Sequence, residues 1–220
     1  DKLAPLLTLC CSAGLQNAIF AVANLFIQAG VNRFDALMVE GNSAAANADG
    51  LIYDVMAAFH TACASFIGQN YGAGNRDRVR RTYWISLSYS FAAGAVLGLS
   101  LVFFGRGFLA LFTDSAEVAA AGMHRLYIMG FSYAISAFMD CTIAASRGLG
   151  RCVVPTIIVV LGSCVFRVIW VYTIFASVGT IASLYLLYPV SWTLTAGAEM
   201  VYFFYLYRKV FRNPAKPATV

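Results

Sequence analysis

The chain has 220 residues, of which 60% are hydrophobic and 11% are charged, and its mean hydropathy is +0.74. A soluble domain has roughly 45–50% apolar and about 25% charged residues. This contrast excludes a soluble enzyme, a disordered protein and a secreted disulfide-linked scaffold. The composition instead indicates a protein that crosses a membrane several times.

Six long hydrophobic segments follow one another along the chain. A membrane-spanning helix needs roughly 20 apolar residues. The segments lack the alternating pattern of a β-barrel, and only helices and closed barrels satisfy their backbone hydrogen bonds in lipid. We therefore predict an all-α polytopic membrane protein, with a six-helix transmembrane lobe over residues 1–212 and a cytoplasmic tail over 213–220. The expected helices cover residues 5–28, 47–69, 83–104, 123–146, 153–175 and 181–207.

The net charge of +5 is unevenly distributed. With six spans, loops 70–82 and 147–152 and both termini fall on one side of the membrane, and they hold eleven of the fifteen Lys and Arg residues. The positive-inside rule then predicts cytoplasmic termini. Since topology explains the basic residues, no nucleic-acid partner is expected. The chain starts at Asp1 without an initiator Met, which we interpret as a cut inside a longer chain.

Nothing in the sequence points to catalysis or to a metal site. The enzyme motifs H-E-x-x-H and G-x-S-x-G do not occur. The cysteines lie in or beside apolar segments and form no C-x-x-C pair, so we interpret them as small buried hydrophobic residues. They are Cys10, Cys11, Cys63, Cys141, Cys152 and Cys164.

Four charged residues lie well inside the expected spans, away from their ends, where a charge is costly and therefore a candidate for function. Asp54 and Arg167 lie at similar depth from one membrane face, by a rise of ~1.5 Å per residue. An ion pair between them is one interpretation, in which case Asp54→Asn would destabilise the bundle. Asp54 could instead bind a proton or cation, or reach an aqueous cavity.

Asp140 and Glu199 share a second depth, near the cytoplasmic ends of their helices. Two carboxylates at one level could share a cation or exchange a proton. The alternative is two separate carboxylates, each solvated or hydrogen-bonded.

Amide side chains recur along the first expected helix. Four amides fall on multiples of four, with Asn17 beside the first; they are Gln16, Asn24, Gln28 and Asn32. Amides facing lipid would be costly, so this polar stripe either forms interhelical hydrogen bonds or lines a central cavity for substrate. The residues Phe20, Tyr53 and Met56 could add an adaptable apolar wall to that cavity, or could simply be core.

Several motifs resemble the C-terminal half of the multidrug and toxic compound extrusion (MATE) family. They are FIGQNYGAGNRDRVRR at 66–81, GLQN at 14–17, IQAGVN at 27–32, RGLGR at 147–151, CVFRVIW at 164–170 and YPVSW at 188–192.

The resemblance implies one lobe of a twelve-helix fold in a bacterial inner membrane. It also implies secondary active efflux of small cationic or amphiphilic molecules by antiport with H⁺ or Na⁺, with no cofactor besides that ion. The partners would be the lipid bilayer and either a missing N-terminal lobe or a second copy of this chain as a homodimer. The alternative is a fragment or assembly module without transport activity by itself.

Overall fold

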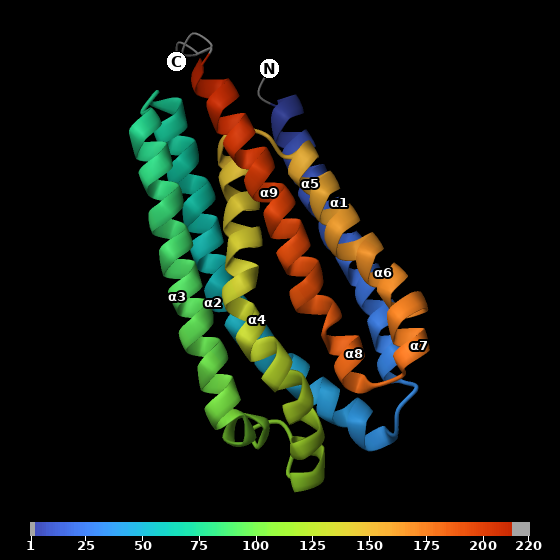
Figure 1. Cartoon of the computed structure of the whole chain (residues 1–220). Coiled ribbons are helices and arrows are strands. Elements are labelled where there is room, and N and C mark those ends of the chain that lie inside the picture. The colour runs from blue at the N-terminus through green and yellow to red at the C-terminus, as the bar shows by residue number, and fades with distance from the viewer. Residues whose placement is uncertain (1–2, 213–220) are drawn as a thin grey trace.

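A computed structural model describes residues 3–212, and this part of the chain is helical and contains no strand (Figure 1). The first four helices are α1 (Leu3–Val31), α2 (Ala36–Gly72), α3 (Arg76–Leu109) and α4 (Ala116–Gly148). The prediction of an all-α membrane bundle is confirmed. Lys2 and the tail predicted at 213–220 lie outside the described residues.

The second half of the chain forms two further columns of helix. The fifth column is continuous from α5 (Val153–Val159) through η1 (Val160–Val165), α6 (Phe166–Trp170) and η2 (Val171–Phe175) to α7 (Ala176–Val178). The sixth consists of α8 (Ile181–Tyr185) and α9 (Leu187–Arg212). Within the described residues, five helices are long and apolar enough to cross a membrane, the fifth column counting as one. Polar residues such as Thr195 and Glu199 interrupt the apolar sequence of α9.

α4 is the central helix of the bundle. It packs against α2, α3 and α9, and much more of it is buried than of any other membrane-spanning helix. Glycines allow the close approach, because a Cβ on Gly98 of α3 would overlap the backbone oxygen of Gly130 in α4. In the same way, a Cβ on Gly41 of α2 would lie 2.7 Å from the backbone nitrogen of Gly122. Small residues therefore set the distances between these helices.

α1 and the fifth column lie side by side, away from α3 (Figure 1). α9 runs between them and α4, and both chain ends lie at the same end of the bundle. A cavity between α1, α2 and α4 holds the candidate site.

Three helices begin well before the hydrophobic pattern predicts, and one of them is α3, which starts at Arg76 rather than near residue 83. α2 starts at Ala36 rather than near residue 47, because the Asp35 side chain caps it by accepting a hydrogen bond from the Met38 N–H (2.9 Å). α4 starts at Ala116 rather than near 123, and Ser115 caps it by accepting from the Val118 N–H (3.3 Å). The added turns carry polar residues, which the hydrophobic pattern places in a loop.

The sixth column breaks at Leu186, three residues before Pro189. Proline has no N–H to donate to the carbonyl four residues earlier, here that of Tyr185. Pro189 consequently sits in the first turn of α9, where the missing donor costs nothing.

Candidate functional site

A cavity of about 480 Å³ lies between α1, α2, α4, the fifth column and α9. Seven of the side chains predicted from the sequence line it: Gln16, Asn17, Phe20, Asn24, Tyr53, Asp140 and Arg167. Aromatic residues complete the wall, with Tyr133 from α4 and Tyr188 and Trp192 from α9. The cavity therefore combines amides, opposite charges and aromatic surfaces.

Arg167 is almost fully buried on the wall that the fifth column provides. Its Nε donates to the Ser191 Oγ (3.2 Å). Its guanidinium carbon lies 4.7 Å from the centre of the Tyr188 ring and 5.6 Å from that of Phe20. Stacking on aromatic faces suits the planar guanidinium and holds its position.

The ion pair expected between Asp54 and Arg167 does not form. Asp54 is exposed on α2, and the single salt bridge among the described residues joins Arg125 to Asp49. α2 begins eleven residues earlier than predicted, which shifts the depth at which its charged residues were expected.

The observed ion pair is buried and has several hydrogen-bond partners. The Nε of Arg125 lies 2.7 Å from the Oδ2 of Asp49, and its Nη1 donates to the Oδ1 of Asn42 (3.0 Å). The Tyr185 hydroxyl donates to the same Asn42 oxygen (3.1 Å). Both members of the pair line the cavity, so the cluster ties α2, α4 and α8 together beside it.

The polar stripe of α1 serves both purposes that the sequence left open. Gln16 lines the cavity and its Oε1 also accepts from Arg147 Nη2 (2.6 Å). Gln28 does not line the cavity, and its Oε1 accepts from Asn42 Nδ2 (3.3 Å). Asn17 and Asn24 are exposed at the cavity edge.

The three apolar candidates have different positions. Phe20 is half-buried and Tyr53 is 59% exposed, and both line the cavity. Met56 is fully buried and lies against Gly94 of α3, so it belongs to the core.

Asp140 and Glu199 have separate environments. Asp140 lines the cavity from α4. Glu199 does not, and its side chain is fully buried in α9 with neither carboxylate oxygen hydrogen-bonded. Ser146 Oγ and Arg147 Nε on the adjacent helix α4 are likewise buried without a partner. Among the described residues, no group of three or more His, Cys, Asp or Glu side chains is arranged to hold a metal ion.

Sequence reasoning missed Asp49, Arg125 and the aromatic wall. Arg125 was placed at a helix start, whereas α4 begins nine residues before it. Asp35 and Ser115, each a capping residue type before a long helix, are signals that could have moved these charges inside their helices.

Comparison with known proteins places these features in a family. Residues 13–173 match the model of the family described as MatE. Among curated proteins, the chain is similar to an FAD transporter of Shewanella oneidensis, with 28% identity over 106 residues, or 48% of this chain and 24% of that protein.

Two solved structures show the same fold. A MOP superfamily transporter from Pyrococcus furiosus is 16% identical with a TM-score of 0.85, over 94% of this chain and 47% of its own. The Vibrio cholerae MATE transporter VcmN, in the bent form, is 18% identical with a TM-score of 0.81. The match covers 94% of this chain and 47% of that transporter. The chain thus spans about half the length of these structures.

Proposed function

The chain belongs to the MATE family of membrane transporters, and from this premise we propose that it forms the C-terminal lobe of a secondary active exporter. The substrate class is small cationic or amphiphilic molecules, and the driving reaction is antiport with H⁺ or Na⁺. The setting is a bacterial inner membrane. One observation carries the proposal: an aromatic cavity inside the bundle holds Asp140 and Arg167, two oppositely charged side chains that do not pair with each other.

The walls of the cavity favour amphiphilic substrates over purely cationic ones. Tyr133, Tyr188 and Trp192 offer flat apolar surfaces, and aromatic faces also attract cations. Arg167 has no carboxylate partner among the described residues, so a substrate with an anionic or acceptor group would meet a ready donor. Amides on α1 orient polar groups without requiring one sign of charge.

Asp140 and Glu199 are the proposed coupling groups. Asp140 is where a substrate and the coupling ion would compete. Glu199 is buried without a hydrogen-bond partner, and an isolated buried carboxylate is costly. The Glu199 carboxylate therefore needs a proton, a cation or a water molecule beside it. During transport the coupling ion would bind to this carboxylate and leave it in turn.

A polar stripe on α2 supports a missing partner lobe. Its members are small or polar, are exposed, and are spaced three or four residues apart along one face. Lipid would solvate them poorly. The cavity opens beside this stripe, at Gly50 and Tyr53. The stripe consists of Ser43, Asn47, Gly50, Asp54, Ala58, Thr61 and Ser65.

The partner would be an N-terminal lobe of the same protein or a second copy of this chain. Two lobes rocking about a shared cavity give alternating access. Asp54, the third coupling candidate, would then act at the lobe interface rather than inside this bundle.

Dye efflux from a drug-sensitive bacterium tests the proposal. The 220-residue chain is compared with the same gene extended upstream to its natural start, each also with Asp140→Asn and with Glu199→Gln. Asp77→Asn, an exposed carboxylate at the start of α3, is the matched control. We expect the extended form to pump, the control to match it, and both coupling variants to lose most of the efflux at equal expression.

Repeating the assay with and without Na⁺, at fixed pH gradients, separates Na⁺ from H⁺ coupling. Efflux by the short chain alone would favour a homodimer over a chain that needs an N-terminal lobe. Absence of efflux from an expressed and folded extended form would refute the transport proposal. The remaining interpretation would then be an assembly module without transport activity.

A further inference from the structure

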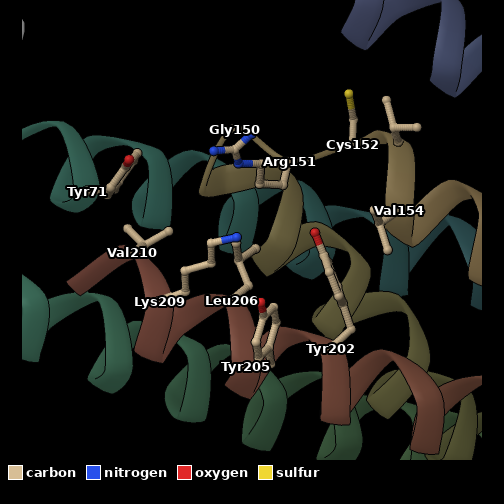
Figure 2. A pocket seen from close by; sticks show the side chains of 11 residues that line it. Tyr71, Gly150, Arg151, Cys152, Val154, Tyr202, Tyr205, Leu206, Lys209 and Val210 are labelled. Carbon is tan, nitrogen blue, oxygen red and sulfur yellow. The ribbon is translucent and has the colours of Figure 1, made fainter. Parts of the chain in front are cut away.

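A second cavity, of about 650 Å³, lies at the end of the bundle that carries both chain termini. Its walls are the last turns of α9, residues 150–152, the start of α5 and Tyr71 at the end of α2. Figure 2 shows Tyr202 and Tyr205 turning their hydroxyl groups toward the Arg151 side of this groove, with Lys209 beside them.

The polar part of the groove is cationic. Arg151 and Lys209 both line it, no Asp or Glu is among its lining residues, and neither cation forms a salt bridge within the described residues. The Lys209 ammonium lies 5.8 Å from the centre of the Tyr205 ring. The groove is thus lined by two positive charges and three tyrosines, Tyr71 among them, and phosphate oxygens accept hydrogen bonds from such groups.

The other part of the groove is apolar and open. Val153 and Val154 line it and are 50% and 42% exposed. They are at the start of a column that is long and apolar enough to span a membrane, where exposed apolar side chains are expected to meet acyl chains. Tyrosines near helix ends lie at headgroup depth.

We propose that this groove binds an anionic phospholipid of the surrounding leaflet. Arg151 and Lys209 contact the phosphate, Tyr202 and Tyr205 donate to its oxygens, and Val153 and Val154 contact the acyl chains. Basic pockets between membrane helices bind acidic headgroups in this way. Arg78 and Arg81 lie in the arginine-rich first turns of α3, are exposed, and do not line this groove.

Native mass spectrometry of the purified 220-residue chain tests the site with phosphatidylglycerol and phosphatidylcholine. The groove variant combines Arg151→Gln with Lys209→Gln. The control combines Arg78→Gln with Arg81→Gln and removes the same charge from the same end. A basic residue near an acidic lipid surface strengthens binding about fivefold, so we expect roughly 30-fold weaker phosphatidylglycerol binding in the groove variant and little change in the control.

Three outcomes would overturn the proposal. The first is an equal loss of phosphatidylglycerol binding in both double variants, and the second is phosphatidylcholine binding as tight as that of phosphatidylglycerol. The third is full competition by soluble glycerol phosphate, which would indicate a site for free anions. A second, milder variant keeps the proposal testable if the groove double variant does not fold. Tyr205→Phe removes one exposed hydroxyl and should weaken phosphatidylglycerol binding severalfold, while unchanged binding would count against the assigned contact.

Discussion

The buried ion pair of Arg125 and Asp49 gives a sharp test at the scale of single residues. Asp49→Asn leaves the Arg125 guanidinium buried without its counter-charge, and breaking such a pair costs about 3–5 kcal/mol. Asp54→Asn is the same substitution five residues along α2, at an exposed position, and should change stability by under about 0.5 kcal/mol. Thermal unfolding in detergent compares them, and equal effects would contradict the structural assignment.

The residues of the cavity were partly predictable. The amide stripe and Arg167 stood out because polar groups in an apolar span need a protein or cavity partner. The partner of each charge could not be predicted, because pairing depends on how each helix is rotated and on where it starts, and polar residues in the early turns hide those starts. Asp54 and Asp49 are close in sequence, yet one is exposed and the other lies against Arg125.

At the scale of helices, the glycine contact between α3 and α4 fixes their separation. Gly98→Ala would place a methyl group against the Gly130 backbone, and overpacking of this kind costs about 1–3 kcal/mol. Gly107→Ala is the control on the same helix, where a Cβ meets nothing within 4 Å. That change should be neutral or slightly stabilising, since alanine favours helix by up to ~1 kcal/mol.

Thermal unfolding of the two alanine variants measures the difference. A Gly98→Ala protein as stable as Gly107→Ala would mean that α3 and α4 do not meet at this glycine. The small-residue spacing of Gly94 and Gly98 was visible in the sequence, but the helix that they contact was not, because the motif specifies a close approach and not a partner.

The fifth column illustrates a feature that the sequence does not reveal. Its hydrophobic run predicts a plain helix over 153–175, whereas π-helical turns occur on both sides of α6, which carries Arg167. Such turns are frequent at functional sites and change the direction of the residues between them. Here the π-helical turns flank Arg167, which is buried and lines the cavity. The position of its side chain depends on contacts with Ser191 of α9 and Phe20 of α1 rather than on local helix propensity.

At the scale of the whole molecule, the bundle has a basic end and a less basic one. Both termini and the arginine-rich turn between α2 and α3 lie at one end, and the connection from α3 to α4 lies at the other (Figure 1). The positive-inside rule therefore predicts that the basic end faces the cytoplasm. Because each connection between the long helices lies at one end of the bundle or the other, assigning one end to the cytoplasm assigns a side of the membrane to each of these connections.

Reporter fusions measure that orientation in living bacteria. Green fluorescent protein fused after Val220 should fluoresce, since it folds in the cytoplasm. Alkaline phosphatase fused after Asp114 should be active, since it needs the oxidising side, and the same enzyme fused after Asn75 should be inactive. The reverse pattern would overturn the predicted orientation. A mixed pattern at equal expression would show that the short chain inserts in both directions, as expected if a preceding lobe normally sets its topology.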